Sequence, residues 1–390
     1  MLSEAKHLCA VAETLRCAQG DMKRENRMLS QDEILKALSR VQEPELHRDL
    51  VSLNMIRDLK ISGGSVQFTV MLTTPACPLR SRIERECKEA VLAVPGVKEV
   101  SIKFDSNVVR DARIGRSDSG GRPLPFRNTI AVASGKGGVG KTTCAVNLAI
   151  ALNRLGATIG LLDADIYGPN VPMMMGVEGR PRIQGDRILP LEAYGLKIMS
   201  MGFLLKPDQP VVWRGPMLHS AIGQFLNDVE WGDLDYLVLD LPPGTGDVQL
   251  SLAQLLPLTG AVIVTTPQDV ALADVRKGMA AFAQLDVPLL GVIENMSYFV
   301  CPHCGERTDI FSHGGGKRAA EELGLPFLGE VAIDPAIRAG GDDGQPIVAV
   351  APHSPQAKSF TDIAGALAAK ISVLNMQREA QGLIQITEIG

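Results

Sequence analysis

A glycine-rich segment at residues 135–142 constrains the fold of this chain more than any other feature. It reads Gly-Lys-Gly-Gly-Val-Gly-Lys-Thr and lies between an apolar run at 129–133, which predicts a strand, and a helical pattern at 143–152. In this setting the backbone N–H groups of the loop and the positive end of the helix dipole face phosphate oxygens. The segment therefore predicts a P-loop, in which Lys141 reaches the β and γ phosphates of ATP and Thr142 binds Mg²⁺.

The chain between residues 128 and 373 predicts an α/β domain around this loop. Further short apolar runs, at 158–162, 236–239, 261–265 and 289–294, alternate with helical segments. Runs that are apolar throughout, rather than at every second residue, are typical of parallel strands covered on both faces. We therefore expect a P-loop NTPase domain built on a parallel sheet.

A small α+β domain is predicted ahead of it. Its helices are expected at 32–41 and 79–93, and its strands at 56–61, 65–72 and 97–104. Glycine, serine and proline then gather as in a flexible linker. The predicted segments are a frayed N-terminal extension (1–27), the small α+β domain (28–105), a flexible linker (106–127), the P-loop ATPase domain with its Cys-x-x-Cys pair (128–373) and a C-terminal tail (374–390).

Charge and hydropathy limit the cellular location and the classes of partner that we expect for this chain. Its net charge of −5 gives no broad electrostatic reason to bind nucleic acid or an anionic membrane. No run approaches the ~20 apolar residues of a membrane-spanning helix, and the N-terminus lacks the apolar core of a signal peptide. The odd number of cysteines, 7, disfavours a disulfide framework. We expect a cytoplasmic protein with no nucleic-acid or membrane partner.

Aspartates end two of the predicted strands. Asp163 and Asp165 follow one apolar run, and Asp240 follows another. Since the carboxyl ends of parallel strands lie at one edge of a sheet, we expect these carboxylates to lie beside the P-loop. Each aspartate alone also suits a strand end or a turn. Their combination with the P-loop indicates a site that hydrolyses a nucleotide.

Cys301 and Cys304 are the cysteines with the spacing of metal ligands. A Cys-x-x-Cys turn brings two thiolates to one metal, whereas zinc or a [4Fe-4S] cluster normally takes about four ligands. The simplest completion is the same pair from a second copy of the chain. A structural zinc and a redox-active thiol pair stay open as alternatives. Cys77, in a loop before a helix, either assists in handling a cluster or is simply buried.

Five segments form a set that is known from one family. They are the P-loop and the segments 163–170, 213–217, 240–247 and 301–304. Together they resemble the Mrp/ApbC iron-sulfur cluster carrier ATPases, which are part of the MinD/ParA-like superfamily. The resemblance spans about residues 128–370. The small domain, with its segments 43–46 and 73–78, is similar to one found in iron-sulfur assembly factors.

This resemblance implies roles for individual residues. In the deviant P-loop class, a second lysine, here Lys136, crosses a dimer interface to the phosphates of the partner, although a solvated surface lysine is the plainer interpretation. An ordinary loop asparagine is likewise the alternative to a base-binding role for Asn295. The implied catalytic residues are Lys136, Lys141 and Asp165, the last acting on the attacking water. The implied Mg²⁺ residues are Thr142, Asp163 and Asp240, and the γ-phosphate switch contains Gly244 and Asp247. The implied ATP-binding residues are Gly135, Lys136, Gly137, Gly138, Val139, Gly140, Lys141, Thr142, Thr143 and Asn295.

The resemblance also implies a function. Such carriers bind a [4Fe-4S] cluster across a homodimer interface, here through Cys301 and Cys304, and transfer it to apo iron-sulfur proteins, with a cluster-assembly scaffold as a further partner. Mg²⁺-dependent ATP hydrolysis is coupled to handling of the cluster. Asn170 and Met173 depart from the residues common in the family, and we expect neither to touch the nucleotide chemistry. The alternative function is a MinD/ParA-like ATPase that acts as a regulatory switch and holds a structural zinc.

Overall fold

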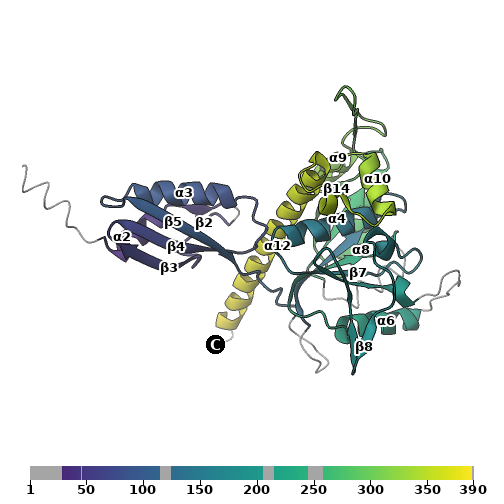
Figure 1. The fold of residues 1–390 in the computed structure, drawn as a ribbon, viewed down its shortest axis with the longest axis horizontal. Helices are drawn as coiled ribbons and strands as arrows, with labels where there is room; N and C mark the ends of the chain where they lie inside the picture. Colours follow the sequence, from purple (N-terminus) through teal and green to yellow (C-terminus); the bar gives the residue numbers. More distant parts are fainter. Residues whose placement is uncertain (1–28, 45, 115–123, 205–214, 245–257, 389–390) are drawn as a thin grey trace, which may run out of the picture. The chain divides into compact units, whose positions relative to one another are not determined.

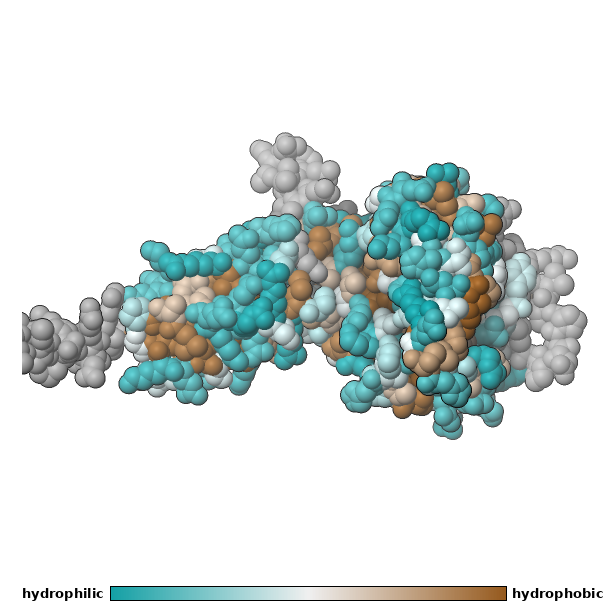
Figure 2. All heavy atoms as spheres, turned by 90° about the horizontal axis from the view of Figure 1, so that it is seen from above, coloured by the Kyte–Doolittle hydropathy of each residue, from teal (hydrophilic) through white to brown (hydrophobic). Residues whose placement is uncertain are grey.

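The computed structural model describes residues 29–44, 46–114, 124–204, 215–244 and 258–388. The predicted extension at 1–27 lies outside them. The chain divides into two compact units, unit 1 with Met1–Leu72 and Leu79–Asn107, and unit 2 with Thr73–Pro78 and Val108–Gly390. Each unit has its own sheet (Figure 1). On the face drawn in Figure 2, smaller apolar patches interrupt a mostly hydrophilic surface, as expected when most apolar side chains lie in cores.

Unit 1 is a small α+β fold on a sheet with the strand order β3-β4-β5. Alternate residues of β4 are buried, the pattern of a strand with one face on a core. A capping box between Ser30 and Glu33 fixes the start of helix α2. The helices are α2 (Gln31–Leu38) and α3 (Arg80–Leu92), and the strands are β1 (Gln42–Glu43), β2 (Arg48–Asp49), β3 (Ile56–Ser62), β4 (Ser65–Leu72) and β5 (Glu99–Ser106).

Unit 2 is built on an eight-stranded sheet in the order β10-β11-β7-β12-β6-β13-β14-β17. Its described strands run parallel to their neighbours, except β10, which is antiparallel to β11 at one edge. The predicted parallel-sheet α/β fold is confirmed. The strands are β6 (Phe126–Ala133), β7 (Ile159–Asp163), β10 (Leu191–Ala193), β11 (Leu196–Ser200), β12 (Leu234–Asp240), β13 (Gly260–Thr265), β14 (Leu289–Glu294) and β17 (Phe327–Glu330).

Helices cover both faces of this sheet. Successive residues of each strand point to opposite faces, so each face has a core of its own. Ile130 and Val132 of β6 belong to a core that α4 and α12 close, while Ala131 and Ala133 belong to a second core under α6, α8 and α9. These helices are α4 (Lys141–Arg154), α6 (Gly215–Asn227), α8 (Ala271–Ala283), α9 (Gly315–Glu322) and α12 (Pro355–Glu388). The P-loop strand β6 therefore lies at the centre of the unit.

Short elements connect the main strands and helices of unit 2. The hairpins among them were not predicted from the sequence. They are α5 (Val171–Met174), β8 (Arg182–Gln184), β9 (Arg187–Leu189), η1 (Met201–Leu204), β15 (Phe299–Val300), β16 (Arg307–Thr308), α10 (Pro335–Asp342) and α11 (Ile347–Val350). Residues of α5 and α10 line a cavity along the P-loop. In the part of the chain that is described, every helix is too short or too polar to cross a membrane.

Two stretches beside the predicted segment boundaries belong to unit 2. In the predicted linker at 106–127, Val108, Asp111 and Ile114 are buried, and the Asp111 carboxylate is held by Arg113 and Arg378. Helix α12 also continues through the expected end of the domain at residue 373, with Arg378 paired to Asp111 one helical turn further on.

Candidate functional site

The P-loop leaves β6 at Ala133 and enters α4 at Lys141. Gly138 and Gly140 have φ angles of +79° and +77°, a left-handed conformation that suits glycine and turns the backbone N–H groups inward. Asn295, directly after β14, donates from Nδ2 to the carbonyl oxygen of Val139 at 2.9 Å. This bond ties the loop to β14. It also brings Asn295 to the predicted site, with its amide nitrogen engaged by the protein.

Lys141, Thr142 and Asp240 lie together, as their positions in the sequence suggested. Lys141 Nζ is 2.6 Å from Asp240 Oδ1 and 3.6 Å from Asp165 Oδ2. The Thr142 hydroxyl donates to Asp240 Oδ2 at 2.7 Å. Burial raises the pKa of Asp240, while the Lys141 ammonium opposes that rise. The buried lysine is therefore compensated by carboxylates of its own chain.

The two aspartates after β7 differ in their surroundings. Asp163 Oδ1 accepts the N–H of Asp165 at 3.1 Å, and its Oδ2 accepts the Ser200 hydroxyl at 2.9 Å and the Val171 N–H at 3.2 Å. Burial, and then the charge of Asp240, raises the pKa of Asp163 above its ordinary value. Asp163 thus has a structural part in shaping the loop, whereas Asp165 lines the nucleotide pocket.

Lys136 contacts Asp274, a residue that was not predicted from the sequence. Its Nζ lies 3.3 Å from Oδ2 of Asp274 in the first turn of α8. The distance is that of an ion pair, and the geometry does not qualify as a hydrogen bond. A Cβ on Gly135 would come within 2.7 Å of the Asp274 carbonyl oxygen, so α8 packs directly on the loop. Nothing in the sequence around Asp274 indicates this contact.

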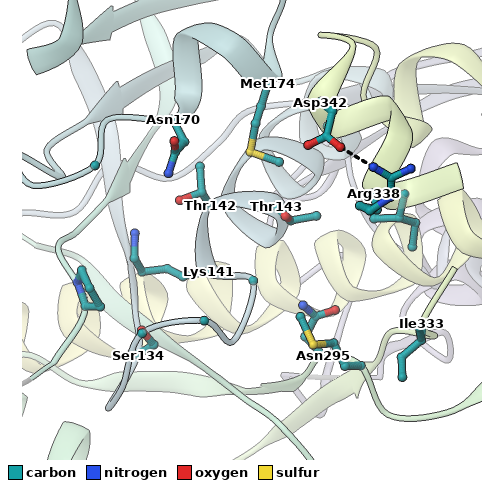
Figure 3. Close-up of a pocket in the computed structure, with 18 of the residues that line it drawn as sticks. Ser134, Lys141, Thr142, Thr143, Asn170, Met174, Asn295, Ile333, Arg338 and Asp342 are labelled. Atoms are coloured by element: carbon teal, nitrogen blue, oxygen red, sulfur yellow. Dashed lines mark hydrogen bonds and ion pairs between the residues drawn. The ribbon is translucent and has the colours of Figure 1, made fainter. Parts of the chain in front are cut away.

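A cavity of about 880 Å³ extends along the P-loop. Figure 3 shows Lys141 and Thr142 toward one end, and Asn295, Ile333 and Arg338 toward the other. The first group suits phosphates, and the second leaves room for a nucleoside. Asn170 and Met173 also line the cavity. That neither takes part in the nucleotide chemistry stays a prediction. Met173 belongs to α5 and Asn170 directly precedes it, and the first residue of α5, Val171, is held by Asp163.

The predicted switch is described only at its beginning. Gly244 has a φ of +95°, and its N–H donates to the carbonyl oxygen of Ser134 at 2.9 Å. This bond connects the end of β12 to the end of β6. Asp247 lies outside the described residues.

Cys301 and Cys304 occupy the turn of a hairpin formed by β15 and β16. Phe299 pairs with Thr308 and Val300 with Arg307, and the Cys301 N–H donates to the Glu306 carbonyl at 2.9 Å. Cys304 is exposed and Cys301 half-buried. The N–H groups of Cys304 and then His303 lower the pKa of the Cys301 thiol. No three His, Cys, Asp or Glu side chains of the described residues are grouped to hold a metal ion.

Together these features define a class of protein. A parallel sheet whose central strand leads through a P-loop into a helix, with aspartates at the ends of the next two strands on one side, contains the nucleotide site of a P-loop NTPase. A family model described as NUBPL iron-transfer P-loop NTPase (ParA) matches residues 125–368, and one described as iron-sulfur cluster assembly protein matches 31–103. The chain belongs to the NUBPL iron-transfer P-loop NTPase family, which confirms the resemblance seen in the sequence.

Relatives share much of the chain. An iron-sulfur cluster carrier protein of Synechocystis sp. is 51% identical over 352 residues, which are 89% of this chain and 99% of that protein. The iron-sulfur cluster transfer protein NUBPL of Dictyostelium discoideum is 50% identical, covering 64% of this chain and 78% of its own length. A solved nucleotide-binding protein from Archaeoglobus fulgidus in complex with ADP is 38% identical, with a TM-score of 0.54 over 61% of this chain and 93% of that one.

Proposed function

We propose that the protein is an iron-sulfur cluster carrier that hydrolyses ATP. The observation that carries this proposal is a cysteine pair on an exposed turn in the same unit as the P-loop. The relatives named as cluster carriers and the family as a whole support it. An exposed turn suits cargo that is received and given away, with apo iron-sulfur proteins as recipients and a cluster-assembly scaffold as donor. The cytoplasm is the proposed location.

The proposed cargo is a [4Fe-4S] cluster shared by a homodimer. Cys301 and Cys304 supply two sulfurs, and such a cluster takes about four. A second copy related by a two-fold axis presents the same turn and completes the set. Neighbouring acidic side chains are already paired, since Asp309 and Glu330 both contact Arg307.

Hydrolysis is assigned to the residues at the phosphate end of the pocket. Asp165 is proposed to orient the attacking water, and Lys141 to hold the β and γ phosphates. Lys136 is proposed to leave Asp274 and reach the phosphates of the partner protomer. Gly244 and Asp247 are proposed to report the γ phosphate to the dimer interface. Closure of the dimer would then couple ATP turnover to the hold of the cysteines on the cluster.

Magnesium fits the same end of the pocket. The Thr142 hydroxyl and the Asp240 carboxylate present oxygens 2.7 Å apart, and oxygen is the ligand that Mg²⁺ prefers. We propose that these two residues hold the ion, which supplies neutralisation of phosphate charge. The closeness of Asp163 to the ion, predicted from the sequence, stays a proposal, as do the domain boundaries at 28–105 and 128–373.

Anaerobic reconstitution with iron and sulfide tests the proposal. The parent is expected to gain a broad absorption near ~400 nm and about four irons per dimer. The Cys301→Ala/Cys304→Ala variant should gain neither, while Cys87→Ala, which removes a buried thiol outside the pair, serves as a control. Zinc alone, or iron that is indifferent to the loss of both cysteines, would favour a nucleotide switch with a structural metal.

A further inference from the structure

The hairpin with the two cysteines leads directly into the wall of the nucleotide pocket. β16 ends at Thr308, and Ile310 and Phe311 line the same cavity as the P-loop. Their side chains are 51% and 43% exposed. Apolar side chains that are open toward a ligand pocket gain free energy when a ligand covers them.

The upstream end of this stretch is fixed beside the nucleoside end of the pocket. Thr308 pairs with Phe299, and Phe299 forms a bridge with Ile333. The Ile333 N–H also donates to the carbonyl oxygen of Tyr298 at 2.6 Å. Ile333 lies at the end of the pocket away from Lys141 (Figure 3).

The downstream end is fixed on the same side. The N–H of Gly316 in α9 donates to Glu294 Oε2 at 2.5 Å, and Glu294 directly precedes Asn295. Asn295 also lies toward the nucleoside end (Figure 3). Both ends of the segment that carries Ile310 and Phe311 are therefore held near residues of the nucleoside end.

Arg307 stiffens the connection between the pocket wall and the cysteine turn. Its guanidinium lies 2.9 Å from Glu330 Oε1 and 3.3 Å from Asp309 Oδ1, and it stacks 3.9 Å from the centroid of the Tyr298 ring. These contacts join β16 to both β17 and the residue that precedes Ile310. Ile310 is therefore linked to the hairpin by these contacts as well as by the chain itself.

We propose that Ile310 and Phe311 pack against the nucleoside of a bound adenine nucleotide, and that the nucleotide thereby fixes the hairpin that carries Cys301 and Cys304. This inference rests on the proposed function in one respect, namely that Cys301 and Cys304 bind the cluster. It adds a path from nucleotide to cysteines within one protomer, separate from closure of a dimer. Bound nucleotide holds the turn in one arrangement, and the empty pocket leaves it freer.

The first half of the test measures nucleotide affinity in the full-length, cluster-free chain. Phe311→Ala and Ile310→Ala should each raise the Kd for ADP in calorimetry, by about tenfold for the phenylalanine. Ile183→Ala is the matched control, because Ile183 is 75% exposed on β8 and is not among the residues lining the cavity. Circular dichroism checks that all variants fold. An unchanged affinity in Phe311→Ala overturns the packing of this residue on the nucleoside.

The second half measures alkylation of individual cysteines by iodoacetamide, followed by mass spectrometry of peptides. Saturating ADP should slow the modification of Cys301 and Cys304 in the parent and leave Cys77 unchanged as an internal reference. In the Ile310→Ala/Phe311→Ala variant, saturating ADP should no longer slow it. Equal rates with and without ADP in the parent overturn the coupling.

Cluster loading of the same preparations separates this inference from the proposed function. A parent that loads a cluster on Cys301 and Cys304 but shows ADP-independent alkylation remains a carrier without the coupling. A parent that shows ADP-dependent alkylation but loads no cluster retains the coupling and loses the carrier function.

Discussion

Lys136 makes a contact in the site that no sequence motif specifies. The sequence identifies it as a P-loop lysine, and the structure adds its ion pair with Asp274, 3.3 Å away. Its side chain is 36% exposed, so the pair is partly screened by solvent. A weak, partly solvated ion pair of this kind keeps Lys136 beside Asp274 of its own protomer. The lysine can exchange Asp274 for a more highly charged anion such as a phosphate.

Asp274→Asn should favour the ATP-bound dimer, because it removes the charge that competes for Lys136. Each dimer breaks two such pairs, one per protomer, so pairs worth about 0.5–1 kcal/mol each correspond to a dimer that is about five- to thirtyfold tighter. Sedimentation velocity with a non-hydrolysable ATP analogue measures this. Asp269→Asn is the control, since Asp269 is exposed and lies 3.9 Å from Arg318. A weaker dimer in Asp274→Asn would mean that Asp274 positions Lys136 rather than restrains it.

Two glycines of the P-loop should respond differently to the same change. A Cβ on Gly140, at a φ of +77°, meets the Asn295 amide, whereas a Cβ on Gly137 meets nothing within 4 Å. Gly140→Ala should lower the free energy of unfolding without nucleotide by at least about 1–2 kcal/mol. Gly137→Ala should stay within about 0.5 kcal/mol of the parent. Urea denaturation measures both, and equal losses would contradict the geometry of the loop.

The residues that could be predicted are those with a motif or a strand end to mark them. Lys141, Thr142 and Asp240 lie together because a P-loop and the carboxyl end of a neighbouring parallel strand must meet. Asp274, Ile310 and Phe311 reach the same site through long-range packing, for which a single sequence carries no local signal. Asp163 was recognised by its position, but its hydrogen bonds to Ser200 and Val171 depend on loops that the sequence does not determine.

At the level of elements, long regular patterns were predictive and short ones were not. β4 was expected at 65–72 and is found at Ser65–Leu72, and α4 was expected at 143–152 and is found at Lys141–Arg154. The hairpin of β15 and β16 has strands of 2 residues each, which is too short for any periodicity. It is held by the contacts of Arg307 instead, and these involve a distant strand.

The stretch before β6 and the end of α12 are joined at Asp111. Arg113 Nη2 and Arg378 Nη1 lie 3.0 Å and 2.8 Å from its Oδ2. Burial alone would raise the pKa of Asp111, but the hydrogen bonds and charges of the two arginines hold it below 3.8, its ordinary value. The carboxylate therefore stabilises the fold above pH 3.8, and this contribution is lost as the pH falls through the lowered pKa.

Asp111→Asn should thus cost about 1.5–3 kcal/mol of unfolding free energy at pH 7, and the difference from the parent should shrink at the most acidic pH at which both still fold. Urea midpoints along a pH series measure it. Asp233→Asn serves as a control, because Asp233 is 73% exposed and 3.6 Å from Arg127. A difference that does not depend on pH would mean that the charge of Asp111 is not what joins the two elements.

At the scale of the whole molecule, a shared cluster predicts how mixed dimers behave. When parent chains and Cys301→Ala/Cys304→Ala chains mix at random in equal amounts, about a quarter of the dimers carry both cysteine pairs. Iron content after reconstitution should then fall to about a quarter of the parent value. Iron analysis of co-expressed, separately tagged chains gives the result. About half the parent iron would show that each chain loads independently.

The pairing of Lys141 with Asp240 and Asp165 affects which phosphate-containing metabolites can bind in the pocket. Any anion that enters the pocket must first draw the lysine away from carboxylates already 2.6 Å and 3.6 Å from it. Free phosphate offers only its charge for this exchange, whereas a nucleotide adds contacts along the rest of an 880 Å³ cavity. We therefore expect the site to respond to the nucleotides of a cell more than to the inorganic phosphate dissolved beside them.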